Sequence, residues 1–244
     1  MPLKTLLLAA TAALAVGGCT RAADQAVDPA FGEKVRAYLL QHPEVIEEAV
    51  QKLQEKKDAE AADKAKLALK SDRQTLEHDP RDFVANPGGK ITVTEFYDYR
   101  CPHCINAAPQ VLQIIKDNPD VRFVFKEMPI FGAVSEHAAR TAIAAKNSGG
   151  DYMGLYKDFM STKGLNDSAV DLIAKAHGLD PAKVDQGQAR TAADAQIADA
   201  HNLADKLDID GTPTFIIGDT IVPGEDMDAV RAAIAKAKAG AKAS

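Results

Sequence analysis

The sequence of 244 residues contains no tryptophan and only three cysteines. No second Cys/His pair stands at ligand spacing from its Cys-x-x-Cys motif, which excludes a four-ligand zinc site. The formal net charge of −6 gives no indication of nucleic-acid binding. The apolar run from Thr5 to Val16 is shorter than the roughly 20 residues that span a bilayer. A hydrophobic fraction of 46% and abundant alanine instead indicate one largely helical globular domain with an extension.

The N-terminus has the pattern of a targeting segment. Residues 1–19 combine a positive start at Lys4 with a short apolar run, and they end in Val-Gly-Gly-Cys, which resembles a lipoprotein signal-peptidase box. Cleavage before Cys19 would leave that cysteine as the lipid-bearing end of an exported protein, followed by a flexible tether over residues 20–30. The alternative is an ordinary secretory signal that is cut between Arg21 and Ala23.

A predicted strand leads into a Cys-x-x-Cys motif at the first turn of a predicted helix. Ile91 to Tyr97 is rich in β-branched and aromatic residues, and Ile105 to Lys116 repeats its apolar positions at helical spacing. Residues three apart on a helix share a face, roughly 5 Å apart at Cα, so Cys101 and Cys104 can open and close a disulfide. The helix dipole stabilises a thiolate on Cys101, the predicted nucleophile, and leaves Cys104 as the resolving thiol.

The two residues between the cysteines fit a redox pair. Pro102 suits the opening turn of a helix, and His103 can donate to, or place positive charge near, the Cys101 sulfur. An acidic Cys101 is a good leaving group, so the pair is predicted to be oxidising. The alternatives are a structural disulfide and, from another class of function, binding of Cu(I) by the two thiolates. Attachment of c-type haem would require a histidine where Ile105 stands.

Residues 31–79 form a separate charged segment. A short helix is predicted from Phe31 to Gln41, and a second begins at Pro43, after which about 35 residues would make a rod of roughly 50 Å. Two apolar stripes lie on these helices: Phe31, Val35, Tyr38 and Leu39, then Val45, Ile46, Ala49, Val50 and Leu53. They bury too little area to fold alone, which predicts an oligomerisation arm with a charged stalk. The alternative is an arm folded back on its own domain.

The remaining residues, 80–244, are assigned to one catalytic domain with a helical insertion over about 133–207. A second strand is predicted from Val121 to Glu127, in which Lys126 lies either near Glu95 or exposed at the strand end. An edge strand at Ile221-Val222 and a closing helix from Asp226 to Lys238 complete the domain. Three histidines of the insertion have no partner at metal spacing and are interpreted as surface or helix-end residues: His137, His177 and His201.

These motifs resemble a known family. The segments Glu95-Phe96, Cys101-Pro102-His103-Cys104 and Gly211-Thr212-Pro213-Thr214-Phe215 look like the thioredoxin-fold DsbA-type disulfide oxidoreductases. The stretch from Tyr38 to Ile46 resembles the N-terminal segment of their ScsC branch, which comprises periplasmic, often oligomeric proteins associated with copper tolerance and disulfide isomerisation. The resemblance, over roughly residues 30 to 240, implies an α/β thioredoxin fold with a helical insertion, preceded by an N-terminal helical oligomerisation arm.

The resemblance also implies roles for three residues outside the Cys-x-x-Cys motif. Glu95 would be buried beneath the second cysteine, with a raised pKa, and would relay the proton of Cys104. The alternative for Glu95 is a carboxylate that reaches solvent at the strand end. The Thr212-Pro213 bond would be cis and would pack against the cysteine pair, so that the Thr212 backbone pairs with a substrate strand.

The implied function is that of a periplasmic, lipid-anchored thiol–disulfide oxidoreductase, specifically an oligomeric disulfide isomerase, with a trimer favoured. Its partners would be misfolded or reduced secreted proteins and a membrane thiol reductase of the DsbD or ScsB type, and it would require no cofactor. The Pro102-His103 dipeptide favours a net oxidase instead, whereas Thr212 before the proline resembles the isomerases. Sequestration of Cu(I) by Cys101 and Cys104 is the alternative from another class.

Overall fold

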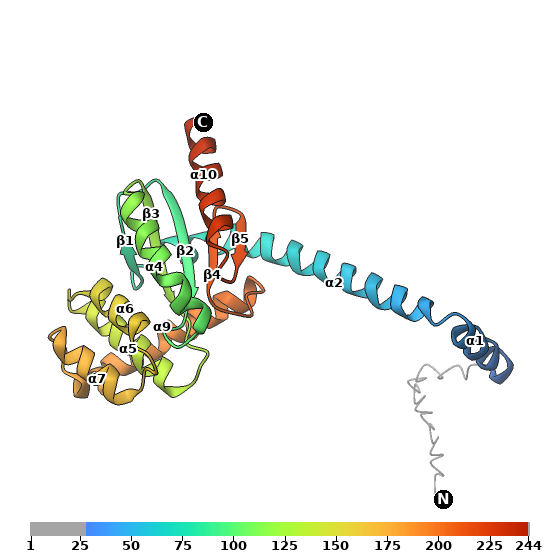
Figure 1. The fold of residues 1–244 in the computed structure, drawn as a ribbon, viewed down its shortest axis with the longest axis horizontal. Coiled ribbons are helices and arrows are strands. Elements are labelled where there is room, and N and C mark those ends of the chain that lie inside the picture. The colour runs from blue at the N-terminus through green and yellow to red at the C-terminus, as the bar shows by residue number, and fades with distance from the viewer. Residues whose placement is uncertain (1–27, 244) are drawn as a thin grey trace, which may run out of the picture. The chain divides into compact units, whose positions relative to one another are not determined.

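The computed structural model describes residues 28–243 (Figure 1). The predicted signal segment with Cys19, and the tether up to residue 27, lie outside these residues. Contacts divide the chain into two compact units, Met1–Glu55 and Lys56–Ser244. No helix in the described part of the chain is long and apolar enough to cross a membrane.

The first unit contains helix α1 (Pro29–Gln41) and the start of helix α2 (Glu44–Ser71). The Asp28 carboxylate caps α1 by accepting a 3.1 Å hydrogen bond from the Ala30 N–H, and Pro29 occupies the first turn, where no N–H is needed. No residue of α1 is buried. Large apolar side chains of this unit are exposed: Phe31, Val35, Tyr38, Leu40, Ile46, Val50 and Leu53.

The second unit is built on a five-stranded sheet. Its strands are β1 (Phe83–Ala85), β2 (Ile91–Tyr97), β3 (Val121–Glu127), β4 (Thr214–Ile217) and β5 (Thr220–Pro223), in the order β1-β3-β2-β4-β5. The central pair β2 and β3 is parallel, and the other pairs are antiparallel. The sequence predicts β2 as a central strand, but the three-residue edge strand β1 gives too short a pattern to be recognised.

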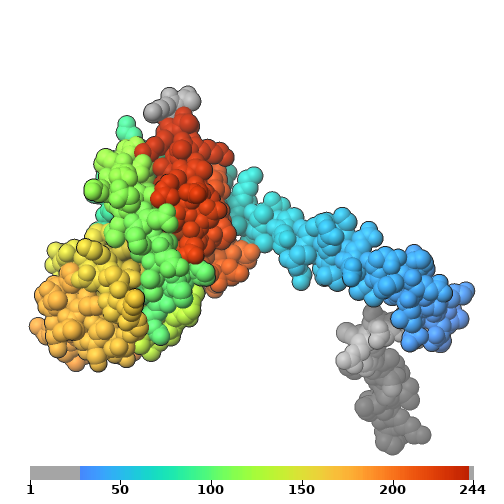
Figure 2. Space-filling model, in the orientation of Figure 1, coloured from blue at the N-terminus to red at the C-terminus, as the bar shows by residue number. Residues whose placement is uncertain are grey.

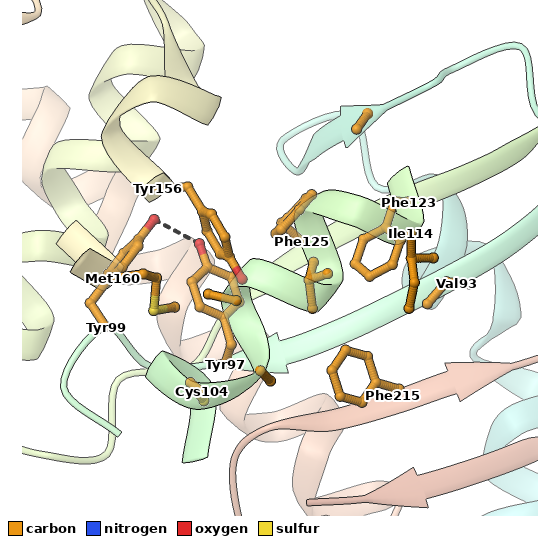
Figure 3. Packing of buried hydrophobic residues seen from close by; sticks show 14 of the residues in the cluster. Val93, Tyr97, Tyr99, Cys104, Ile114, Phe123, Phe125, Tyr156, Met160 and Phe215 are labelled. Carbon is orange, nitrogen blue, oxygen red and sulfur yellow. Dashed lines mark hydrogen bonds between the residues drawn. The ribbon is translucent and has the colours of Figure 1, made fainter. Parts of the chain in front are cut away.

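One face of the sheet is covered by α4 (Pro102–Asp117), α6 (Tyr152–Ser161) and α10 (Met227–Ala243). Side chains that point to this face from the strands share one apolar cluster with residues of α4, of which Figure 3 labels Cys104 and Ile114. They are Val93, Tyr97, Phe123, Phe125 and Phe215, which meet Ala107, Ala108 and Val111. Figure 2 shows α10, in red, beside α4, in green. This layer fixes the start of α4, and with it both cysteines, over the end of β2.

The opposite face is covered by the end of α2, by α3 (Arg73–His78) and by the end of α9 (Gly187–Lys206). Leu69 and Leu76 are almost completely buried, at 3% and 1% exposure, in a cluster with Phe96 of β2. The structure therefore differs from the expected domain boundary at Pro80, because these two leucines of the charged segment belong to the core. Leu67 of the same helix is exposed.

Lys126 lies on this second face, away from Glu95. Neighbouring residues of a strand point to opposite faces, and residues paired across two strands point to the same face. Lys126 is paired with Phe96 and shares its face, whereas Glu95 is paired with Phe125 on the other face. The Lys126 ammonium lies 2.5 Å from the buried Asp82 carboxylate and donates a 2.7 Å hydrogen bond to the Thr75 carbonyl. Both expectations for Lys126 are therefore wrong, since it is neither near Glu95 nor exposed.

The helical insertion comprises α5 (Ala133–Asn147), α6, α7 (Asp167–Ala176), α8 (Pro181–Val184) and most of α9, in the predicted range. His137 is buried rather than at the surface: its Nδ1 lies 3.2 Å from Asp167, and its Nε2 lies 3.3 Å from Asp171. Two carboxylates of the neighbouring helix α7 hold this ring inside the insertion. Partly buried His177 and His201 contact the Asp158 carboxylate at 2.9 Å and the Pro129 carbonyl at 3.2 Å.

Candidate redox site

The start of α4 positions the two cysteines. Cys101 is the N-cap residue, and Pro102 stands in the first turn, where its missing N–H leaves no bond unmade. The Cys101 carbonyl accepts from the Ile105 N–H at 3.0 Å, which closes the first turn and puts Cys104 on the same face. Both cysteines are free thiols, with 2% of Cys101 and none of Cys104 exposed. Cys101 is therefore the more exposed of the two cysteines, as predicted, although both are almost completely buried.

The surroundings separate the pKa values of the two thiols. The hydrogen bond with the Cys104 side chain and the backbone N–H groups of Cys104 and His103 lower the pKa of Cys101 to about 5, against the opposing effect of burial. Burial, the bond to Cys101 and the charge of Glu95 raise the pKa of Cys104 far above its usual value. At neutral pH the dithiol form therefore carries a thiolate on Cys101 and a proton on Cys104.

His103 contributes to the site through its backbone. Its N–H is one of the groups that lower the pKa of Cys101. Its imidazole is 66% exposed, and Nδ1 lies 3.3 Å from the Glu225 carboxylate. The sequence shows that His103 is close to Cys101. It does not show that the backbone N–H of His103 acts on the sulfur while the imidazole lies near Glu225.

The loop before β4 brings Thr212 to the cysteine pair. The Thr212-Pro213 peptide bond is cis, and the Cys101 thiol donates a 3.0 Å hydrogen bond to the Thr212 carbonyl. The loop is fixed on either side: the Thr214 hydroxyl donates to the Gly211 carbonyl, and the Gly224 N–H donates to the Pro213 carbonyl, both at 2.8 Å. Thr212 thus presents a backbone acceptor directly beside the nucleophilic sulfur.

Glu95 is buried on β2 on the face that carries Cys104. It has no exposed surface, and within the described part of the chain neither of its carboxylate oxygens has a hydrogen-bond partner. Burial, followed by the charge of Glu127, raises the pKa of Glu95 well above its usual range. The alternative of a carboxylate reaching solvent is therefore wrong. The charge of Glu95 is one of the causes that raise the pKa of Cys104.

Asp98, which is not among the residues predicted from the sequence, organises the loops around Cys101. One oxygen of its buried carboxylate accepts from the Arg100 N–H at 2.6 Å and the Ser135 hydroxyl at 2.9 Å. The other accepts from the N–H groups of Ile130 and Phe131, at 2.7 and 3.0 Å. Only the first of these four bonds, an Asx turn just before the motif's first cysteine, leaves a signal in the sequence.

Glu127, at the end of β3, is a second buried carboxylate that the sequence analysis did not single out. One of its oxygens accepts hydrogen bonds from the hydroxyls of Tyr97, Tyr99 and Tyr152, at 2.5, 3.0 and 2.7 Å. Figure 3 shows the Tyr97 and Tyr99 hydroxyls meeting, with Tyr156 beside them. Burial raises the pKa of Glu127 to about 8 even though these hydroxyls lower it. We call Glu127 and these three tyrosines the tyrosine-bound carboxylate.

Exposed apolar side chains flank the loops that Asp98 organises. Ile130 and Phe131 are 42% and 43% exposed. The Arg100 guanidinium donates a 2.9 Å hydrogen bond to the Phe131 carbonyl, which connects this pair to the segment before Cys101.

Across residues 28–243, no group of three or more His, Cys, Asp or Glu side chains is arranged to hold a metal ion. The chemistry available is thiol–disulfide exchange by Cys101 with proton transfer at Cys104.

Comparisons with known proteins agree with this geometry. Residues 92–235 match the DSBA-like thioredoxin domain, and residues 29–60 match the copper resistance protein ScsC N-terminal domain. The structure is similar to that of Proteus mirabilis ScsC in a transitional conformation, with a TM-score of 0.64 and 26% identity over 88% of this chain and 100% of that one.

Two curated relatives match shorter parts of the chain. The thiol:disulfide interchange protein DsbA of Bordetella pertussis is 34% identical over 53% of this chain and 64% of its own length. The Na⁺/H⁺ antiporter NhaA 1 of Salinispora arenicola is 30% identical over 66% of this chain, but the match covers only 26% of that protein. The chain thus spans about a quarter of the length of the antiporter that it matches.

Proposed function

The chain belongs to the DSBA-like thioredoxin domain family, with an ScsC-like N-terminal region, and we propose that this thiol–disulfide oxidoreductase works as an oligomeric disulfide isomerase in the periplasm. The observation that carries the thiol–disulfide exchange in this proposal is the opposite displacement of the two thiol pKa values at the start of α4. A thiolate on Cys101 attacks disulfides, and a protonated Cys104 stays unreactive until a mixed disulfide has formed.

The proposed exchange conserves electrons. The Cys101 thiolate attacks a wrong disulfide of a client; the client S–S bond breaks, and one client sulfur leaves as a thiolate. If another client thiol displaces Cys101, the client disulfide is rearranged without net oxidation. If Cys104 displaces the client instead, its proton passes to Glu95, the client is reduced and the enzyme is oxidised. A membrane thiol reductase of the DsbD or ScsB type would then restore the dithiol.

Clients of this site would be misfolded or reduced secreted proteins. The Thr212 carbonyl beside Cys101 is suited to pair with an extended client backbone. The exposed Ile130 and Phe131 favour an apolar segment next to it, which a misfolded chain offers and a folded surface mostly does not. The exchange itself requires no cofactor.

The N-terminal unit supports the oligomeric part of the proposal. In the described part of this unit, exposed apolar side chains such as Ile46, Val50 and Leu53 have no buried residues to pack against. Packing these stripes against copies of the same chain, in a trimer, would bury them and gather several cysteine pairs around one client. Cys19, if lipidated, would tether the assembly to a membrane.

A specific observation favours each of two rival functions. The low pKa of Cys101 makes this sulfur a good leaving group, as in a net oxidase. The match of residues 29–60 to a copper resistance protein domain, together with two adjacent sulfurs, favours sequestration of Cu(I) by Cys101 and Cys104. The redox state of the pair in cells discriminates between them: a mostly reduced pair supports isomerase or copper binder, and a mostly oxidised one supports the oxidase.

The decisive experiment changes the arm and leaves the redox site intact. Val50→Glu with Leu53→Glu places charges on the exposed stripe, and Leu172→Glu, at a 69% exposed leucine of α7, is the matched control. We expect the double variant to be monomeric by light scattering and to lose most rescue of scrambled ribonuclease, with dithiol reduction unchanged. The control should keep both the oligomer and the rescue. A wild-type monomer, or a monomeric variant that isomerises equally well, would remove the oligomeric isomerase.

A further inference from the structure

Two buried carboxylates lie on one face of the central strand pair. In the register of β2 and β3, Tyr97 is opposite Glu127 and Phe125 is opposite Glu95. Side chains alternate along a strand, so Glu95, Tyr97 and Glu127 all point to the face covered by α4 and α6. Glu95 is fully buried, and 3% of Glu127 is exposed. Two carboxylates this close in a dry core disfavour simultaneous ionisation.

Their hydrogen bonding is unequal. Glu127 accepts from three tyrosine hydroxyls, whereas in the described structure both oxygens of Glu95 lack a donor. Hydrogen bonds from neutral donors stabilise the ionised form of a carboxylate, so a single negative charge shared by the pair resides on Glu127. Glu95 then keeps its proton. Above about pH 8, the tyrosine-bound carboxylate therefore carries the negative charge of the pair.

The titratable groups that shift the pKa values of this pair and of Cys104 come from three parts of the fold. From β2 and the loop after it come Tyr97, Asp98 and Tyr99; from α4 comes Cys104; and from α6 come Tyr152 and Tyr156. The lysine of β3, Lys126, points to the other face and pairs with Asp82. Among these described residues, the groups that act on the pair are acids, phenols and a thiol, and none of them carries a positive charge.

We propose that Glu127 is a positioning residue for disulfide exchange, which holds the charge of the buried carboxylate pair and thereby sets the pH at which Glu95 can take the proton of Cys104. This inference rests on the proton relay of the proposed function. The charge of Glu127 is, after burial, the cause that raises the pKa of Glu95. Glu127 touches neither sulfur in the exchange and acts through Glu95.

The step in question is the release of a client from Cys101. The Cys104 sulfur bonds to the Cys101 sulfur, the bond from Cys101 to the client sulfur breaks, and the client leaves with the electron pair as a thiolate. The Cys104 proton passes to the ionised Glu95 carboxylate. The rate therefore rises with pH as Glu95 ionises, and removing the charge of Glu127 moves that rise to lower pH.

The test is a stopped-flow reaction of the reduced full chain with one equivalent of Ellman's reagent. Attack by Cys101 releases the first chromogenic thiolate, and displacement by Cys104 releases the second, so one trace separates the two steps. In Glu127→Gln we expect the pH midpoint of the second phase to fall by about one unit, because a like charge beside Glu95 is gone. The first phase should keep its midpoint, since Glu127 is not among the groups that shift the pKa of Cys101.

Two further variants identify the path of the effect. In the Glu95→Gln background, Glu127→Gln should cause no additional shift, because the group that senses the charge has been removed. Tyr152→Phe removes one of the three donors to Glu127 and should move the midpoint in the same direction by less, and it also carries the test if Glu127→Gln does not fold.

Two results would overturn the proposal: unchanged second-phase midpoints in the folded variants, or an equal shift without Glu95. Loss of the first phase in the wild-type protein would instead refute the proposed oxidoreductase site. Failure of this inference and failure of the proposed function are therefore distinguishable in one experiment.

Discussion

The Cys101 thiol donates a 3.0 Å hydrogen bond to the backbone carbonyl of Thr212, 111 positions further along the chain. A thiolate cannot donate, so ionisation of Cys101 leaves this carbonyl free to accept from another group. A client backbone N–H beside the sulfur is then the natural donor to this carbonyl. We therefore expect the Thr212 carbonyl to be free to bind a client backbone when Cys101 is a thiolate, which is also the form that attacks disulfides.

The first prediction concerns the ionisation of Cys101. The ultraviolet absorbance of the thiolate in the reduced protein should titrate with a midpoint at about pH 5. The folded pKa lies below the ordinary value of 9.0, so this group stabilises the dithiol form fully above the unfolded value and loses its effect as the pH falls through the folded one. From about pH 5 to about pH 7, the dithiol should gain roughly 2 kcal/mol over the disulfide form in urea unfolding. Parallel pH curves for the two forms would contradict this.

The second prediction separates the roles of the two cysteines. Cys101→Ser should abolish insulin reduction and rescue of scrambled ribonuclease, because the low-pKa nucleophile is lost. Cys104→Ser should instead accumulate mixed disulfides with clients, visible on non-reducing gels, because release from Cys101 loses its resolving thiol. If only Cys101→Ser trapped clients, the assigned roles would be reversed.

The third prediction is that a substitution of Glu95 can slow thiol exchange and at the same time raise the free energy of unfolding. Glu95→Leu removes a buried carboxyl whose oxygens have no partner among the described residues, so it should raise the free energy of unfolding by about 1–3 kcal/mol. Glu95→Gln keeps a buried polar group and should give no such gain. Both variants should lose the rise of the Cys104-dependent rate with pH, because neither can ionise and accept the Cys104 proton. Unchanged exchange rates in both folded variants would remove the relay.

The fourth prediction tests the loops held by Asp98. Asp98→Asn replaces one accepting oxygen by a donor that faces other donors, which should cost about 2–4 kcal/mol of stability. Ser135→Ala removes only one of the four bonds, and about 1 kcal/mol is expected. Thermal unfolding of both variants gives the comparison. Equal effects of the two substitutions would show that the loops are held by other contacts.

The fifth prediction tests whether α3 belongs to the catalytic core. Leu76→Ala should destabilise the domain by about 2–5 kcal/mol, because the side chain is 1% exposed and covers Phe96. Leu67→Ala, at a 70% exposed leucine of α2, is the control and should change stability by less than about 0.5 kcal/mol. Denaturant unfolding measures both. A similar loss in the two variants would place the instability in the helices rather than in the core.

The sequence predicts the elements that carry strong local patterns. The β-branched run of β2, the periodic α4 and the cysteines at its start can be recognised because burial and helix geometry act within a few residues. The environment of Glu127 cannot, since its donors Tyr97 and Tyr152 stand 30 and 25 positions away and meet it only through the register of β2 with β3 and the packing of α6. Such polar clusters depend on tertiary structure and have no spacing rule.

Lys126 and Leu76 show two other limits. Periodicity predicts the strand that contains Lys126, but it does not show which face is covered by which helix, and hence not that Asp82 lies on the other side. In the charged segment, Leu76 is one apolar residue among many polar ones, so its composition predicts a solvated stalk. Its burial depends on a strand that follows it in the chain.

Because Leu69 and Leu76 lie in the core, an engineered fragment that keeps the redox domain intact must begin before them. A designer who transplants this redox module onto a foreign multimerising scaffold, or expresses it alone for screening, would cut at Pro80 if guided by charge patterning. That fragment would leave Phe96 and Ile216 without their cover and expose an apolar surface prone to aggregation. A cassette that starts at Lys56, where the second compact unit begins, keeps both leucines in the core.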